Sequence, residues 1–306
     1  MYIVGESVDD VLEQLITFIM LHGKYAAPRN IEITESIGVI IELRNPRRRI
    51  QYNPARNLNV HFALGEFLWY FSGDNLLENI TYYNRRYGDY SDDNFILNGA
   101  YGKRIFGFDT HKNSQWQTIK KIFDKDIYTR QGVISIFSPN DIIIKTKDVP
   151  CTCSLQFFVR EGKLDMIVYM RSNDLIWGTP YDIFSFTMFQ EILANELNVE
   201  LGKYIHFIGS AHIYSYHNKL CQNILKVKEY EKKEMPPLDI YSDEHILEIV
   251  ECAKLIRKGE KIDILPKTKT GQGIVAFLID YAQHKKGYKE ENFTNDIPDY
   301  FNIEKI

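Results

Sequence analysis

The segment Pro150-Cys151-Thr152-Cys153-Ser154 contains the side chain best suited to nucleophilic chemistry. A thiolate attacks electron-poor carbon and can leave again, so covalent catalysis is one possible role for Cys151. A buried structural cysteine is the commoner role of a single thiol. Zinc sites need a second pair of ligands, and zinc deaminases need Cys-x-x-Cys after proline and an upstream His-x-Glu. The sequence has neither pattern, so we expect no metal.

Three further groups of residues are suited to phosphate, base or sugar. In Arg171-Ser172-Asn173-Asp174 a forked cation stands beside a hydroxyl donor, a combination suited to phosphate. In Trp177-Gly178-Thr179-Pro180-Tyr181-Asp182 the glycine and proline predict a sharp turn, and helix capping is the simplest role for Asp182. Alternation predicts that His212, Tyr214 and Tyr216 face one way in a strand, either toward a sugar or as satisfied core residues.

Hydrophobic periodicity predicts the elements that position these groups. Helical spacing predicts an amphipathic helix over residues 7–22. A nearly continuous apolar run over 58–71 predicts a buried helix with a single carboxylate, Glu66. Alternating and β-branched runs predict a strand and hairpin over 37–52 and further strands over 132–137, 154–160, 164–170 and 204–208; a long apolar helix is predicted over 182–197. We expect an α+β fold with a large mixed sheet and packed helices, in a single domain over 1–306 with a peripheral C-terminal subregion from about 230 to 306.

Composition narrows the class of protein. The 306 residues are 44% hydrophobic and 25% charged, with a net charge of −4, so the chain is globular and lacks the basic excess of a nucleic-acid binder. The basic cluster over residues 44–49 predicts a solvated turn or strand end, with a polyanion patch as the alternative. Four cysteines do not make a disulfide framework, and the apolar run over 15–21 is too short to span a membrane. We therefore expect a cytoplasmic protein without membrane or nucleic-acid partners.

Five motifs in order resemble the thymidylate synthase superfamily, which includes the cytidylate and deoxycytidylate hydroxymethylases. They are Pro-Cys, Gln156-Phe157, Arg-Ser-x-Asp, Gly-x-Pro and Ala-His-Ile-Tyr, all within residues 148–217. A weaker resemblance extends back to residue 28. The resemblance implies a thymidylate synthase-like fold, a sheet-mediated homodimer, a pyrimidine nucleoside monophosphate as substrate and 5,10-methylenetetrahydrofolate as the one-carbon donor.

The resemblance also implies catalytic roles. Cys151 matches the nucleophile that adds to C6 of the base and makes C5 able to accept a one-carbon unit, and nearby arginines are expected to favour its thiolate. Glu66 matches a general acid and base, for which burial would raise the pKa. Tyr101 matches the tyrosine that helps to remove the C5 proton.

Binding roles are implied in the same way. Arg171 and Ser172 match phosphate ligands, and Arg130 matches an arginine that reaches the phosphate from the neighbouring subunit. Arg29 is assigned to phosphate in an altered N-terminal loop. The remaining assignments are His212 and Tyr214 to the sugar, Asn173 and Asp174 to the substrate, and Asp174, Asn59, Tyr87, Trp177 and Gly178 to the folate.

One departure from the family bears on the base. Thymidylate synthases carry asparagine at the position of Asp182, because an amide pairs with N3–H and O4 of uracil. A carboxyl accepts from the N4 amino group of cytosine and, by sharing a proton, supports N3. A carboxylate facing O4 would place two acceptors together, a mismatch that changes discrimination by orders of magnitude. Hydroxymethylases that act on cytosine carry Asp here, so cytosine is expected.

Other departures bear on the product. Thr152 replaces a histidine, Gln131 replaces a second phosphate arginine, and Tyr87 and Tyr90 stand where two tryptophans are usual. Residues 302–306 differ from the closing tail of the family. Because water reaching the transferred carbon gives a hydroxymethyl group, we expect a CMP or dCMP 5-hydroxymethyltransferase. The alternatives are C5 methylation of dUMP, UMP or a cytidylate, and a non-catalytic nucleotide-binding relative.

Overall fold

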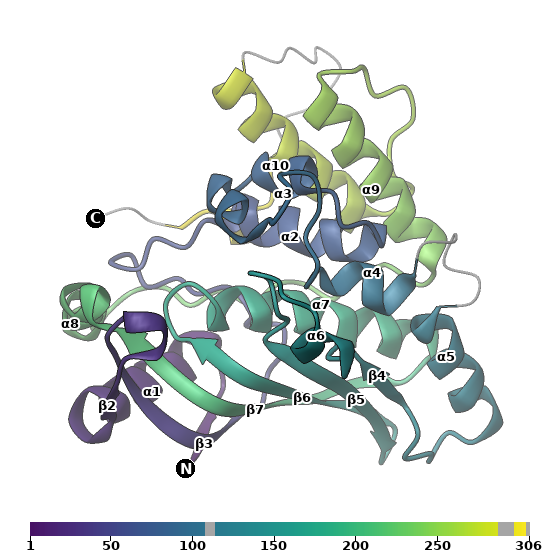
Figure 1. Cartoon of the computed structure of the whole chain (residues 1–306). Coiled ribbons are helices and arrows are strands. Elements are labelled where there is room, and N and C mark those ends of the chain that lie inside the picture. Colours follow the sequence, from purple (N-terminus) through teal and green to yellow (C-terminus); the bar gives the residue numbers. More distant parts are fainter. Residues whose placement is uncertain (108–113, 287–296, 304–306) are drawn as a thin grey trace.

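A mixed β-sheet forms the base of the protein (Figure 1). The computed structural model describes residues 1–107, 114–286 and 297–303. Within them the strand order is β1-β3-β7-β6-β5-β4, with β2 paired to β3. β1 pairs with β3 and β6 with β7 in parallel; the other pairs are antiparallel. The strands are β1 (Tyr2–Gly5), β2 (Lys24–Ala26), β3 (Ile33–Leu43), β4 (Val133–Ser135), β5 (Thr152–Arg160), β6 (Lys163–Asp174) and β7 (Glu200–Tyr214).

Helices are layered on one side of this sheet (Figure 1). Helix α7 (Thr179–Glu196) packs on β6 and β7, and α2 (Val60–Ser72) packs on α7. α9 (Asp243–Lys258) and α10 (Lys269–Lys286) pack on each other and on α2. The other α-helices are α1 (Val8–His22), α3 (Leu77–Thr81), α4 (Tyr101–Phe106), α5 (Gln115–Lys125), α6 (Asn140–Ile143) and α8 (Asn218–Lys226), and short 3-10 helices occupy Pro28–Asn30, Arg85–Tyr90, Ser215–His217 and Asp299–Phe301. The predicted α+β architecture is confirmed.

Capping residues in the sequence explain where helices α1 and α2 begin. At α1, Ser7 accepts from the N–H of Asp10, whose carboxylate accepts from the N–H of Ser7, which is a capping box. At α2, Asn59 accepts from the N–H of Phe62, and Gly73 ends the helix in the left-handed conformation at φ 73°. The predicted helices over 7–22, 58–71 and 182–197 therefore correspond to α1, α2 and α7.

Two expectations are wrong, and a third is only partly confirmed. There is no hairpin over 37–52: the chain leaves the sheet after Leu43, and β3 pairs with β1, β2 and β7 instead. The strand predicted over 204–208 is 15 residues long, because both of its edges are paired. The basic cluster lies in a turn at the end of β3, as predicted, but it is only partly solvated. Arg49 is fully buried and, with Arg47, is paired to Glu191 of α7, because a carboxylate buried in an apolar helix needs cationic partners.

The sheet face opposite the helices carries apolar side chains that this chain leaves exposed. Tyr169 of β6 and Phe207 of β7 are 41% and 38% exposed. Tyr169 and Phe207 are register partners with ring centroids 5.8 Å apart. A contiguous apolar surface of this kind is typical of an interaction surface. Among the described residues, no helix is long and apolar enough to cross a membrane.

Candidate active site

Cys151 and Arg171 are brought together by the pairing of β5 with β6. Cys151 immediately precedes β5, and its carbonyl accepts from the backbone N–H of Arg171 at 2.9 Å. The Arg171 guanidinium donates to the carbonyls of Pro150 and Val149, and its Nη2 lies 3.7 Å from Sγ of Cys151. A Cβ at Gly209 of β7 would lie 2.6 Å from the carbonyl oxygen of Arg171, so a glycine is required there.

The pKa of the Cys151 thiol is raised, contrary to the expectation that arginines favour the thiolate. Burial raises the pKa most, Arg171 lowers it, and the negative charge of Asp182 raises it. Arg29 lowers the pKa as well. Desolvation therefore outweighs the two cations, and the thiol stays protonated at neutral pH in the free protein.

Glu66 is a buried acid held by phenols. Tyr87 donates its hydroxyl hydrogen to Oε1 of Glu66, and the hydroxyl of Tyr70, one helical turn further along α2, is a second hydrogen-bond partner. Burial and then the charge of Asp182 raise the pKa of Glu66 to about 8, although both phenols lower it. Glu66 is therefore mainly protonated at neutral pH and can act as an acid and then as a base.

Tyr101 lies between this acid and the thiol. Its ring centroid is 5.1 Å from that of Tyr70, and its hydroxyl accepts from the backbone N–H of Thr152, the residue after the nucleophile candidate. A Cβ at Gly102 would lie 2.1 Å from the carbonyl oxygen of Tyr70, so α4 approaches α2 closely enough to place Tyr101 only because residue 102 is glycine.

Asp182 is a second buried acid, fixed by a chain of hydrogen bonds. Thr179 donates to Oδ1 of Asn173 at 2.5 Å, and the Asn173 amide donates to Oδ2 of Asp182 at 2.7 Å. Burial raises the pKa of Asp182 to about 7, Asn173 lowers it and Asp174 raises it. Asp182 lies one turn inside α7, whose N-cap is Gly178, so the capping role suggested by the sequence is wrong.

The sugar and substrate candidates lie at the ends of β6 and β7. Asp174 is the register partner of His212, and its Oδ1 accepts from the N–H of Ile176 at 2.9 Å. The His212 ring is 5.1 Å from that of Tyr214. Tyr216 does not continue the strand, because the chain turns into a 3-10 helix over Ser215–His217; its ring instead stacks on Tyr214 at 5.1 Å. Ser172 is half-buried on the same stretch of β6.

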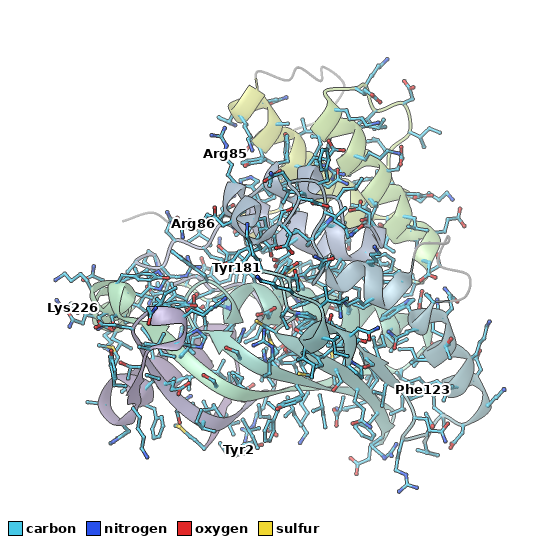
Figure 2. The ribbon with its side chains drawn as sticks, in the orientation of Figure 1. Tyr2, Arg85, Arg86, Phe123, Tyr181 and Lys226 are labelled. Atoms are coloured by element: carbon cyan, nitrogen blue, oxygen red, sulfur yellow. The ribbon has the colours of Figure 1, made fainter. Side chains whose placement is uncertain are left out.

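Next to these residues lies a group of side chains that we call the aromatic rim: Trp177, Tyr216 and His217, with Arg86. The Trp177 ring is 40% exposed and contacts His217 at 4.4 Å, and the Arg86 guanidinium lies 3.9 Å from its centroid. Asn59 caps α2 and gives its backbone N–H to the hydroxyl of Tyr181. Figure 2 shows Tyr181 at the level where the helical layer meets the sheet, with Arg86 above it.

The two remaining phosphate candidates occupy different places. Arg29 is exposed at φ 55° in the short turn before β3, and its charge acts on Cys151 and Tyr90. Arg130 is exposed before β4, where its carbonyl accepts from Gln156 at 3.1 Å. The structure thus gathers the thiol, both acids, Arg171 and the β6–β7 residues, while Arg130 stands at the sheet edge.

Three residues that contact the candidate site residues, Tyr70, Thr179 and Arg86, were not predicted from the sequence. Tyr70 carried a usable signal, since it is four residues from Glu66 on a predicted helix and therefore shares its face. Thr179 and Arg86 carried none, because their partners are set by a turn and by tertiary packing. In the described part of the chain, no group of three His, Cys, Asp or Glu side chains is placed to hold a metal ion.

The mixed sheet presents a thiol beside an arginine, and the helices that cover the sheet supply two buried acids whose pKa values are raised to about 8 and about 7. Residues 11–255 match the family model described as Thymidylate synthase. The chain belongs to the thymidylate synthase family.

The relatives that the chain matches include two deoxyuridylate hydroxymethyltransferases and a thymidylate synthase. The chain is 34% identical to a deoxyuridylate hydroxymethyltransferase of Bacillus phage SP01, over 73% of this chain and 62% of the relative. It is 29% identical to a deoxyuridylate hydroxymethyltransferase of Delftia phage PhiW-14, over 68% and 60%. It is 28% identical to a thymidylate synthase of Staphylococcus haemolyticus, over 54% and 49%. The chain spans less than two thirds of the length of each of these curated relatives.

Proposed function

We propose that the protein is a pyrimidine nucleotide C5-hydroxymethyltransferase that acts on CMP or dCMP with 5,10-methylenetetrahydrofolate. The observation that carries the proposal is the position of Sγ of Cys151, 3.7 Å from an arginine nitrogen, in one site with two acids whose pKa values are raised to about 8 and about 7. A nucleophile and two groups that hold protons at neutral pH are what covalent addition to a pyrimidine requires.

In this proposal Cys151 bonds to C6 of the base, and the electrons displaced from C5=C6 make C5 nucleophilic. Glu66 supplies a proton to the polar edge of the ring as charge develops there. Tyr101, whose hydroxyl lies next to the backbone of Thr152, takes part in removal of the C5 proton. Its pKa is raised well above the usual value by burial, so it acts as a neutral hydroxyl that relays a proton.

Nucleotide binding is assigned to groups around the thiol. Arg171, Ser172 and Arg29 bind the phosphate, and His212 and Tyr214 bind the sugar. Arg130 would complete the phosphate site of a second subunit. The exposed apolar sheet face with Tyr169 and Phe207 supports a homodimer that pairs sheet to sheet, because a surface of this kind is stabilised by burial.

The one-carbon donor fits the aromatic rim. The Trp177 ring is open to solvent, Tyr216 and His217 flank it, and Arg86 offers a cation for carboxylates. A flat ring system with an anionic tail matches this combination. With Asn59, Tyr87, Asp174 and Gly178, these residues would hold 5,10-methylenetetrahydrofolate, which supplies the carbon transferred to C5.

Asp182 supports cytosine as the base. An uncharged carboxyl offers one acceptor, for the N4 amino group, and one donor, for N3. Uridylate is the second candidate, because two relatives are named deoxyuridylate hydroxymethyltransferases and because a protonated carboxyl also offers a donor to O4 and an acceptor to N3–H. The repulsion expected between uracil O4 and Asp182 applies to the ionised form alone.

Tritium release tests the proposal. Purified protein is incubated with 5,10-methylenetetrahydrofolate and each of [5-³H]-labelled CMP, dCMP, UMP and dUMP, and the products are analysed by mass spectrometry. We expect tritium release and a 5-hydroxymethyl product with a cytidylate. Release with uridylates alone would favour the second candidate, and a methyl product would favour a thymidylate synthase-type reaction.

Matched thiol variants complete the test. Cys151→Ser should release no tritium, whereas Cys153→Ser, which changes a neighbouring half-buried thiol, should retain release. Turnover by Cys151→Ser would contradict covalent catalysis. The absence of release from all four nucleotides by the unaltered protein would favour a non-catalytic nucleotide-binding relative.

A further inference from the structure

Tyr87 brings a polar group to a place that is otherwise aromatic. It lies in the 3-10 helix over Arg85–Tyr90, and its ring packs against Phe62 and Trp69 at 5.9 and 5.8 Å. Its hydroxyl donates to Oε1 of Glu66. An indole at this position, which is usual in the family, could not place a hydroxyl on Glu66 and would leave a drier surface.

We propose that Tyr87 is a positioning residue that aims the Glu66 carboxyl at a water molecule, so that this water adds to the carbon carried on C5. The inference rests on the proposed hydroxymethyl transfer. It changes the role of Tyr87 from contact with the folate to control of the product.

Two hydrogen bonds from different segments would hold the Glu66 carboxyl in the orientation that this proposal requires. Tyr87 comes from a segment outside α2, so its hydrogen bond fixes the carboxyl from the side of the rim formed by Arg86 and Trp177, where the transferred carbon would enter. Tyr70 holds the same carboxyl from within α2. The two phenols donate hydrogens to the carboxyl and stay protonated, because burial raises both of their pKa values well above the usual one.

The step balances as follows. The water oxygen bonds to the exocyclic CH₂ carbon, and the electrons of C5=CH₂ move toward C4 of the ring. One water proton passes to Glu66, which is ionised after its earlier proton transfer to the ring. The electrons then return to form C5=C6 as the C6–S bond breaks. The Cys151 thiolate receives the water proton from Glu66, and the ring returns to Glu66 the proton that it accepted earlier, so Glu66 ends protonated as it began. The oxygen and one hydrogen of the water molecule thus end in the hydroxymethyl group, and its other hydrogen ends on the Cys151 thiol.

Tyr87→Phe removes the hydroxyl and keeps the ring. In a single turnover with the protein in excess over the nucleotide, the ratio of the rate of hydroxymethyl product formation to the rate of tritium release reports hydration separately from the earlier cleavage of the C5–H bond. We expect this ratio to fall about tenfold in Tyr87→Phe, since positioned proton transfer contributes about 10²–10⁴-fold and Glu66 itself remains. Tyr241→Phe, at an exposed tyrosine outside the site, should keep the ratio of the unaltered protein. An unchanged ratio in Tyr87→Phe would overturn the inference while leaving the proposed function in place.

A second readout needs neither substrate nor folate. Because the Tyr87 hydrogen bond lowers the pKa of Glu66, its loss should move the titration of the protonated carboxyl band, assigned by its absence in Glu66→Gln and followed by infrared difference spectroscopy, to higher pH in Tyr87→Phe. Tyr87→Trp should show the same upward shift, because an indole does not reach the carboxyl in the same way. A titration identical to that of the unaltered protein would overturn the inference, even if no nucleotide is turned over.

Discussion

The amide of Asn173 donates to Oδ2 of Asp182 at 2.7 Å, and this bond joins the end of β6 to the first turn of α7. The amide is oriented by Thr179, which donates to its other end. Because Oδ2 must accept, a proton on Asp182 resides on Oδ1. The β6–α7 turn therefore fixes the orientation of the carboxyl that we propose reads the base.

Gly178→Ala should disturb this bond. A Cβ at residue 178 would lie 2.9 Å from Nδ2 of Asn173 and 3.0 Å from the carbonyl oxygen of Asp174. We expect nucleotide affinity, measured by calorimetry, to fall about tenfold, consistent with the loss of about 1–1.5 kcal/mol per hydrogen bond. Asn173→Ala removes the same bond without crowding and should show the same loss. Unaltered affinity in Asn173→Ala would show that the bond has no part in binding.

Asp182→Asn should move base preference from cytosine toward uracil by about 10- to 100-fold, the range of about 1–3 kcal/mol for a buried polar mismatch. In the unaltered protein, uridylate binding should weaken as pH rises through about 7, because the ionised carboxylate has no donor for O4. The asparagine variant should lack this titration. Dissociation constants for both nucleotides on either side of neutral pH provide the check, and an unchanged base preference would mean that Asp182 does not read the base.

Arg171→Ala should raise the pKa of Cys151 further, because Arg171 lowers it in the native site. Alkylation of Cys151 by iodoacetamide, resolved from Cys153 by peptide mass spectrometry, should be about three- to tenfold slower at a fixed pH below the pKa. Arg160→Ala on the neighbouring strand β5 should leave the rate unaltered. Equal rates in the two variants would exclude Arg171 as the source of thiolate stabilisation.

Glu191→Gln should destabilise the fold by about 3–5 kcal/mol, because it leaves Arg49 buried without its anion. Burial raises the pKa of Glu191, but Arg49 and Arg47 outweigh it, so the pKa lies below its ordinary value of 4.5. The contribution to stability is therefore present above pH 4.5 and is lost as pH falls through the folded pKa.

Urea unfolding as a function of pH measures this effect. The unaltered protein should lose stability on acidification more steeply than Glu191→Gln. Glu251→Gln, which removes an exposed pair with Lys254, should change the free energy of unfolding by less than about 0.5 kcal/mol. A similarly small change in Glu191→Gln would mean that the buried pair contributes no net stability.

The sequence by itself determined the elements whose patterns are local. The helical spacing of α1, the nearly continuous apolar runs of α2 and α7 and the strand-like runs of β5 and β6 predict those elements, because burial on one face imposes a spacing and burial on all sides imposes an apolar run. The order of short motifs predicted the family, and the apolar run around Glu66 predicted an acid with a raised pKa, which the structure has at about 8.

Only the tertiary structure decided which distant residues meet. The partner of Arg49 is Glu191, the partner of Tyr87 is Glu66, and Arg86 lies on Trp177, and each pair joins segments with no fixed sequence spacing. The thiol pKa also depended on tertiary structure, because desolvation and charge act through space and their balance follows from depth of burial. A sequence specifies which groups are present, whereas the distances and dielectric environment that govern their chemistry arise from packing.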